Sequence, residues 1–393
     1  MLAEIPSFFL STSILSAPGD FVMDPFCGTG TVLLEAAKRG RTPIGADSNP
    51  LARLITRVKL SCISEERIHK ALVRITRVTK SIPVAACPDV VNIDHWFHPH
   101  VKRQLIQLSK AIARTRDLQV REFLQVCFSC CVRDVSKADP RLSVPVALRH
   151  DQYPREHPLL EKTTKRISRL RRINVIKRFI EIAEANARLV SAPLSVPREE
   201  PPVVLRDAAT LGSELEKESI QLVITSPPYL GAQKYIRASS LSLGWLGLAR
   251  VDELKVLDGR SIGREHFRKE TLSVLPPTGI AEADNRIRRT AGINPLRAKI
   301  ASSYLSEMQL VIKQLVALMK PNGYLVLVLG NNHLCGVKFP TERYLRRMAE
   351  AEGLSTRLRL VDIIKSRGLM TKRNKTANLI SREWILLMQK AGS

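Results

Sequence analysis

The segment QLVITSPPY, residues 221–229, is an apolar run that stops at two prolines and an aromatic ring. Leu222, Val223 and Ile224 predict a buried parallel strand, which the prolines end because proline has no N–H with which to continue a ladder. Open α/β sheets bind ligands just beyond the carboxyl ends of their strands. The SPPY segment, Ser226–Tyr229, would there present a hydroxyl, outward carbonyls and a flat stacking surface. Taken alone, a proline turn with a packed tyrosine explains it equally well.

A second motif lies about two hundred residues earlier and favours a ligand site. Residues 20–24 predict a short strand, followed by the glycine turn PFCGTG, a helix at Thr31–Lys38 and a second strand, TPIGAD. Gly28 and Gly30 allow a tight turn and a close approach of the backbone to a ligand. The N–H groups at the start of the helix face the same ligand. A plain βαβ turn is the alternative, but the coincidence of all these features favours cofactor binding.

The acidic residues of this motif indicate which cofactor it binds. Asp47 ends the second strand, where a carboxylate can accept both hydroxyls of a ribose. Leu33 replaces the third glycine of the dinucleotide fingerprint, and Asp24 would repel a pyrophosphate but can receive an ammonium group. A nucleoside with an amino-acid tail therefore fits better than NAD, and S-adenosylmethionine is such a molecule.

The charge of the chain points to a polyanionic partner. Lys and Arg outnumber Asp and Glu by 62 to 37 in 393 residues, a formal net charge of +25. Nucleic acid is the first candidate. An anionic membrane is the alternative, but the sequence has no apolar run of eighteen residues and no basic amphipathic helix at a terminus, so we expect no membrane partner.

The cysteines and histidines predict no metal site. Seven cysteines form no disulfide framework, and the odd number fits a reducing cytoplasm. Cys127, Cys130 and Cys131 lie in an apolar helical run without a second CxxC, which favours buried core thiols over ligands. The spacing of His95, His98 and His100 matches no metal pattern, so a loop cluster is the better interpretation.

Residues 61–202 predict a mainly helical insertion into a catalytic domain formed by 1–60 and 203–393. A basic run within it has eight cations and no acid, which favours phosphate contact over a solvated helix face, where interleaved Glu is usual. The cations of this run are Lys162, Lys165, Arg166, Arg169, Arg171, Arg172, Lys177 and Arg178.

Segments on either side of QLVITSPPY supply further candidates. VVLRDAATL predicts a strand that ends near Asp207, whose carboxylate could accept the adenine amino hydrogen or could cap the next helix. Residues 231–300 follow the SPPY segment directly and could grip the substrate, for example through Lys234 and Arg237. The apolar runs LRLVDIIKS and SREWILLMQK predict a terminal antiparallel hairpin.

With DPFCGTGT at 24–31 and TSPPY at 225–229, the sequence resembles the amino-methylating DNA methyltransferases, and its Ser-Pro-Pro-Tyr is similar to their cytosine-N4 branch. The resemblance covers about 1–60 and 203–390. It implies an α/β fold with a Rossmann-like seven-stranded methyltransferase sheet, S-adenosylmethionine as cofactor, and double-stranded DNA whose target base is swung out. It is also compatible with a cognate restriction endonuclease that acts on the same site.

The resemblance implies a role for each matching residue. The cofactor contacts are Asp24, Phe26, Gly28, Gly30, Asp47 at the ribose and Asp207 at the adenine, and the catalytic residues are Ser226, Pro227, Pro228 and Tyr229. Many cytosine-N4 enzymes have these two motifs in the reverse order. No segment after the last predicted strand resembles a separate recognition domain, so we expect target recognition in 61–200 or 231–300.

The chemistry of the SPPY segment suits an exocyclic amine. Such an amine is a poor nucleophile because its lone pair is delocalised into the ring, and the Ser226 hydroxyl and the Pro227 carbonyl can hold its N–H groups. Tyr229 can stack on the extruded base and offset part of the cost of unstacking. The sequence has no Pro-Cys dipeptide, and Cys27 lies in the cofactor turn, so we expect no covalent cysteine.

Three alternatives remain open. Adenine-N6 methylation would use the same arrangement of acceptors around an exocyclic amine, although Asp or Asn in place of Ser226 would have favoured it. RNA guanine-N2 methyltransferases have a similar cofactor motif but usually carry Asp-Pro-Pro-Tyr. A non-catalytic nucleic-acid-binding subunit could keep the fold, but the intact acids, glycines and SPPY segment argue against it.

Overall fold

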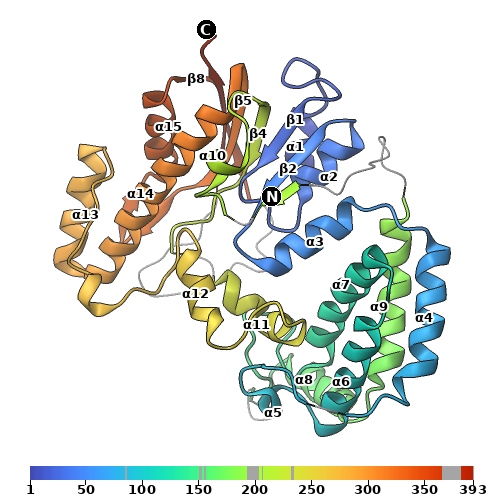
Figure 1. The fold of residues 1–393 in the computed structure, drawn as a ribbon. Coiled ribbons are helices and arrows are strands. Elements are labelled where there is room, and N and C mark those ends of the chain that lie inside the picture. Colours follow the sequence, from blue (N-terminus) through green and yellow to red (C-terminus); the bar gives the residue numbers. More distant parts are fainter. Residues whose placement is uncertain are drawn as a thin grey trace. The chain divides into compact units, whose positions relative to one another are not determined.

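The chain divides into two compact units, each described here by itself (Figure 1). The sheet unit comprises Met1–Thr56, Ser195–Lys234 and Leu257–Ser393, and the helical unit comprises Arg57–Leu194 and Tyr235–Val256. The sequence prediction divided the chain at residues 60 and 202, whereas the chain also enters the helical unit a second time, shortly after the SPPY segment. The computed structural model describes residues 1–84, 86–149, 153–154, 156–192, 203–205, 207–231, 234–364 and 382–392.

In the described residues, seven strands form one sheet in the order β3-β2-β1-β4-β5-β9-β8. The first five strands in this order are parallel, and β9 is antiparallel to both β5 and β8. This confirms the predicted α/β methyltransferase sheet with its terminal hairpin. The strands are β1 (Phe21–Asp24), β2 (Thr42–Ala46), β3 (Val203–Leu205), β4 (Ile220–Thr225), β5 (Met319–Gly330), β8 (Leu354–Ile363) and β9 (Arg382–Lys390); β6 (Asn332–Leu334) and β7 (Val337–Phe339) form a separate hairpin.

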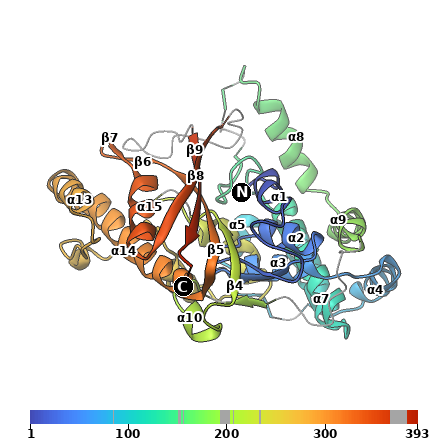
Figure 2. The ribbon, with the colours of Figure 1, turned by 90° about the horizontal axis from the view of Figure 1, so that it is seen from above.

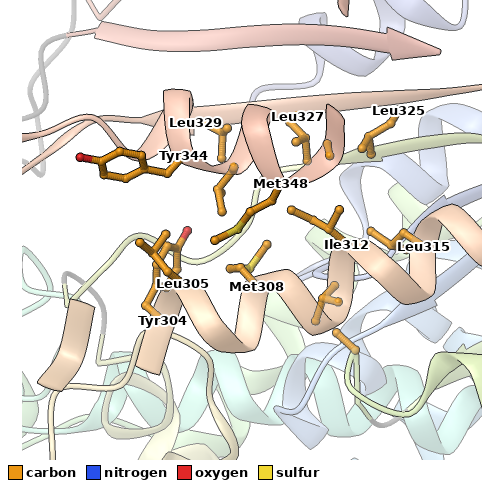
Figure 3. Packing of buried hydrophobic residues seen from close by; sticks show 14 of the residues in the cluster. Tyr304, Leu305, Met308, Ile312, Leu315, Leu325, Leu327, Leu329, Tyr344 and Met348 are labelled. Carbon is orange, nitrogen blue, oxygen red and sulfur yellow. The ribbon is translucent and has the colours of Figure 1, made fainter. Parts of the chain in front are cut away.

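The central strands of the sheet are buried on both faces, which explains why they are continuous apolar runs. Leu222 and Ile224 of β4 pack with Val22 of β1 and with helices α1 (Glu4–Phe9) and α2 (Thr31–Lys38), whereas Val223 belongs to the larger core on the opposite face. Figure 2 shows α1 and α2 on one side of the sheet and, on the other, α13 (Ala281–Ile293), α14 (Pro295–Leu318) and α15 (Thr341–Ala351). In the larger core, α14 packs against β5 and α15 (Figure 3).

The helices of the sheet unit mostly match the prediction, because their apolar periodicity is strong. The helix after the glycine turn spans Thr31–Lys38 as predicted, and a long helix spans Pro295–Leu318. The helices lying wholly or mainly in this unit are α1 (Glu4–Phe9), α2 (Thr31–Lys38), α3 (Pro50–Leu60), α10 (Leu211–Glu214), α13 (Ala281–Ile293), α14 (Pro295–Leu318) and α15 (Thr341–Ala351), with a 3₁₀ turn at Lys269–Thr271. The helix α12 (Glu253–Arg260) is divided evenly between the two units.

The helical unit consists of α4 (Glu65–Thr79), α5 (Ile93–Trp96), α6 (Pro99–Ala113), α7 (Leu118–Val135), α8 (Leu160–Leu170), α9 (Val175–Val190) and α11 (Tyr235–Trp245). Two predictions need correction here. Cys127 and Cys131 are buried in α7, but Cys130 is exposed. The histidines do not form a loop cluster, because His95 lies in α5 and His100 in α6, with His98 capping α6 between them.

Candidate functional site

Asp24, the last residue of β1, is a buried carboxylate held at one oxygen. The Thr225 hydroxyl donates to its Oδ1 at 2.6 Å and the Phe26 N–H donates to the same oxygen at 3.0 Å. Burial raises the pKa of Asp24 to about 7, and these two hydrogen bonds only partly oppose the shift. The site therefore holds a carboxylate that would be stabilised by a cation.

The glycine turn follows directly and is fixed by its neighbours. Gly28 and Gly30 have φ of 51° and 75°, in the left-handed region that favours glycine. A Cβ on Gly30 would lie 2.8 Å from Cγ2 of Thr56, whereas a Cβ on Gly28 would meet no atom within 4 Å. Thr56 also donates its hydroxyl to the Gly28 carbonyl at 3.1 Å. Thr56 thus packs against the turn at Gly30, whereas the turn is open at Gly28, where a ligand can approach the backbone.

The missing third glycine of the dinucleotide fingerprint has a local explanation. That glycine normally permits close packing between helix and strand. Here Leu33 stands in α2, and the neighbouring strand supplies the space instead, because a Cβ on Gly45 of β2 would lie 2.5 Å from the Leu33 side chain.

Asp47 follows β2 and bridges the glycine turn to the next helix. Its Oδ2 accepts the Gly28 N–H at 3.0 Å, and its Oδ1 accepts the Asn49 N–H at 2.8 Å. Burial raises the pKa of the Asp47 carboxyl, which the two backbone hydrogen bonds oppose. Each oxygen retains a further lone pair, so the carboxylate can still accept hydroxyl groups.

Asp207 lies two residues beyond β3 and is half-buried. Its Oδ1 accepts the Ala209 N–H at 2.9 Å, which forms a tight local turn. Thr210 is the N-cap of α10, so the alternative interpretation of Asp207 as the cap of that helix is wrong.

The SPPY segment begins directly after Thr225, the last residue of β4, as predicted. Ser226 is half-buried and Pro227 is buried. The Tyr229 hydroxyl donates a hydrogen bond to the Glu383 carboxylate in β9. Gly263 packs against the segment, since a Cβ there would lie 3.1 Å from the Tyr229 carbonyl oxygen. The tyrosine is therefore held at its phenolic end and at its backbone.

The strand order brings these residues into one row. Because β3, β2, β1 and β4 are adjacent and parallel, Asp207, Asp47, Asp24 with the glycine turn, and the SPPY segment follow one another along the carboxyl edge of the sheet. The N–H of Asp47 bonds the Leu205 carbonyl, which joins the first two positions of the row. This is the edge at which open α/β sheets bind ligands.

Three residues of the site carried no recognised signal in the sequence. Thr225 was part of the quoted motif without a role, and its position beside Asp24 follows from the pairing of β1 with β4. Thr56 and Glu383 act through contacts distant in sequence, and no local pattern marks them.

Cys27 is buried beside Asp24, and burial, with a further contribution from the charges of Asp24 and Asp47, raises the pKa of its thiol. A thiol of this kind is a poor nucleophile at neutral pH. No group of three or more His, Cys, Asp or Glu side chains among the described residues could hold a metal ion.

Several cations of the basic run in the helical unit have acidic partners that the sequence did not reveal. Asp134 of α7 lies 3.7 Å from Arg166, 3.4 Å from Arg169 and 2.6 Å from Arg178. Lys165 pairs with Glu161. The remaining cations are exposed and form no ion pair within the described part of the chain: Lys162, Arg171, Arg172 and Lys177.

Of the two cations after the SPPY segment, Lys234 lies 3.6 Å from Glu265 in the sheet unit. Arg237 is exposed in the first turn of α11 in the helical unit. Their role toward a substrate stays a prediction. No described helix is long and apolar enough to cross a membrane.

Comparison with known proteins indicates that this protein is a DNA methyltransferase. The N6_N4_Mtase family model, described as DNA methylase, matches residues 10–56, which include the glycine turn and Asp47. The type II methyltransferase M.MvaI of Kocuria varians is 23% identical over 81% of this chain and 72% of its own length. M.BsoBI of Geobacillus stearothermophilus is 25% identical over 62% of this chain and 49% of its own length.

Among solved structures, a SAM-dependent methyltransferase from Methanosarcina mazei is 11% identical over 96% of both chains, with a TM-score of 0.32. The family match and the type II relatives support an S-adenosylmethionine-dependent DNA methyltransferase of the N6/N4 kind.

Proposed function

We propose that this protein transfers a methyl group from S-adenosylmethionine to the exocyclic N4 amine of cytosine in DNA, on a base flipped out of the duplex. The observation that carries the proposal is the single row of Asp207, Asp47, Asp24, the glycine turn and the SPPY segment along one sheet edge. In that row the residues suited to a nucleoside end where the residues suited to a target amine begin.

The residues of the first three positions fit S-adenosylmethionine. The open backbone at Gly28 can be approached closely, Asp47 can accept the ribose hydroxyls, and Asp207 can accept the adenine amino group. Asp24 would pair with the ammonium group of the methionine tail, which supplies the cation that a buried carboxylate needs. When bound, the cofactor supplies an activated methyl group on its sulfonium.

The SPPY segment would hold the target. The Ser226 hydroxyl and the Pro227 carbonyl accept the N–H groups of the amine, which turns the nitrogen lone pair toward the methyl donor. The amine would take the methyl group that the bound cofactor supplies, the cofactor would leave as its neutral thioether, and the amine would lose one proton to water. Tyr229, held by Glu383, stacks on the flipped base. Such a transfer depends mainly on positioning and exclusion of water.

The choice of cytosine over adenine as the target base rests on Ser226 in the motif. Site specificity for a DNA sequence and a partner endonuclease are likewise inferred from the family resemblance and the type II relatives.

The proposal is tested by separating catalysis from cofactor binding. We expect Ser226→Ala and Tyr229→Ala to abolish methyl transfer to DNA while calorimetry still detects S-adenosylmethionine binding. Activity retained in either variant would contradict the catalytic assignment. A wild-type protein that binds DNA but neither binds nor uses the cofactor would favour a non-catalytic subunit.

A further inference from the structure

A surface pocket of about 360 Å³ lies between helix α13 and the β6–β7 hairpin. Figure 2 shows the ribbon of these two elements next to each other. Its polar lining includes Asn285, Arg286, Arg289 and Lys338, and its apolar lining includes Ile293 and Val337. Nothing in the row along the sheet edge uses these residues. All of them belong to the sheet unit.

The pocket has a fixed cation and two exposed ones. Arg286 donates to the Lys338 carbonyl at 2.9 Å and lies 3.3 Å from Glu282, so its guanidinium is held in place. Arg289 and Lys338 are exposed. Two cations on different elements thus converge on one pocket with a third already oriented there.

The one carboxylate of the lining does not neutralise this charge. Glu282 also lies 3.1 Å from Arg343 and 3.6 Å from Arg347 of α15. Three arginines therefore share a single acid, and the surroundings of the pocket keep a cationic excess. Arg289 and Lys338 form no ion pair among the residues that the structure describes, so an anion would find charge-assisted donors there without displacing one.

The apolar part of the lining narrows the class of anion. Ile293 and Val337 are 68% and 53% exposed, so they present carbon surface beside the cations. A free phosphate ion has no apolar face, whereas the sugar-phosphate backbone of DNA has both an anionic group and a carbon-rich ring. The mixed lining fits the backbone better.

The hairpin is anchored to Leu230, the residue that follows the SPPY segment. The amide of Asn332, the first residue of β6, donates to the carbonyl of Leu230 at 3.3 Å, directly after Tyr229. The Thr341 hydroxyl donates to the other end of the same buried amide at 3.0 Å. DNA with a base at the SPPY segment would thus have its flanking backbone near this hairpin.

We propose that the pocket between α13 and the β6–β7 hairpin binds a backbone phosphate of the DNA that flanks the target base. The inference rests on the proposed function, because it takes DNA as the substrate. Phosphate contacts of this kind set the register of a protein on the duplex and do not read its sequence.

The test compares the variant Arg289→Gln/Lys338→Gln with a matched control, Lys217→Gln/Lys313→Gln. The control removes the same charge from exposed positions near the opposite end of the sheet, before β4 and late in α14. Binding of a short labelled duplex is measured over a range of salt concentrations. Each phosphate that the protein no longer neutralises should reduce the slope of log K against log salt by about 0.9, so we expect a shift of about 1 to 2 in the pocket variant only.

An unchanged slope in the pocket variant, with cofactor binding and circular dichroism as in the wild type, would overturn the proposal. Inorganic phosphate monitored by NMR supplies a second arm. If the double substitution removes phosphate binding but leaves the slope for DNA unchanged, the pocket takes free phosphate and the DNA assignment is wrong. An equal loss of slope in the control would also contradict it.

Methyl transfer is measured on the same preparations. A wild-type protein with a pocket-dependent salt slope but no methylation of DNA would contradict the proposed function and leave the pocket assignment standing. Methylation of DNA by a protein whose salt slope is the same with and without the pocket substitutions would support the proposed function and contradict the pocket assignment.

Discussion

At the scale of single residues, Asp24 combines a cost to folding with a use in binding. The folded protein buries a carboxyl whose pKa is about 7, while the unfolded chain has the ordinary value of 3.8. Between these values the folded protein holds a proton that the unfolded chain releases. The contribution of this group to stability is therefore fully present below about pH 4 and is lost as the pH rises through 7.

We predict that Asp24→Asn stabilises the cofactor-free protein at pH 8, by on the order of a few kcal/mol, and has little effect at pH 4. The asparagine oxygen can still accept from Thr225 and Phe26, so the local geometry is kept. Thermal unfolding at the two pH values measures the difference. A variant less stable than the wild type at pH 8 would contradict the assigned role of burial.

The same substitution should weaken S-adenosylmethionine binding about 10- to 100-fold, since a hydrogen bond to a charged group contributes about 1.5–3 kcal/mol. In the wild type, affinity should increase as the pH rises toward 7 because the carboxyl must ionise to meet the ammonium group. Calorimetry across pH 6–8 measures both effects. An equal Kd in variant and wild type would show that Asp24 does not contact the cofactor.

A further prediction at this scale concerns the contact between Tyr229 and Glu383. Tyr229→Phe keeps the ring for stacking and removes the bond to Glu383, so we expect kcat/KM for DNA to fall by about tenfold, far less than in Tyr229→Ala. Glu383→Gln keeps an acceptor and should retain more activity than Glu383→Ala.

A double-mutant cycle decides whether the two residues act through each other. Glu383→Ala should cost little further activity once Tyr229 is phenylalanine. Fully additive losses would mean that Glu383 supports the fold of β9 and does not position the tyrosine.

At the scale of elements, the glycine turn depends on both conformation and space. Gly30→Ala introduces strain at φ 75° and a 2.8 Å approach to Thr56, whereas Gly28→Ala introduces strain alone. We expect Gly30→Ala to lower the free energy of unfolding by about 2–3 kcal/mol and Gly28→Ala by about 1 kcal/mol. Chemical denaturation of both variants measures this order, and a larger loss in Gly28→Ala would contradict it.

Local patterns predicted the elements well because the determinants lie within each segment. The apolar run before the prolines, the glycine turn and the helix Thr31–Lys38 are each specified by neighbouring residues, and the row of acids follows once the strands are parallel. Glu383 could not be predicted, since it lies 154 residues from Tyr229. Asp134 was missed for the same reason, and the basic run therefore looked more uniformly free than it is.

At the scale of the whole molecule, charge is spread over both units, and the helical unit has its own cationic surface. Lys162, Arg171, Arg172 and Lys177 are exposed there without ion pairs among the described residues, while Arg166 and Arg178 are tied to Asp134. The unpaired group is therefore the better candidate for phosphate contact.

We predict that changing the unpaired group to glutamine weakens DNA binding and makes its salt dependence shallower, by up to about 0.9 for each phosphate that is no longer bound. Neutralising Lys165 and Arg169, which have acidic partners, should change the slope less and serves as the control. An equal salt dependence of DNA binding in the wild type and all variants would mean that the basic run is a solvated helix face.

The central claim concerns the base that is methylated. Incubation with methyl-labelled S-adenosylmethionine and duplex DNA, with RNA in a parallel reaction, followed by digestion to nucleosides, identifies the product directly. The account predicts label in N4-methylcytosine that disappears in Ser226→Ala. Label in N6-methyladenine would contradict the assignment of cytosine, and label only in RNA guanine would contradict DNA as the substrate.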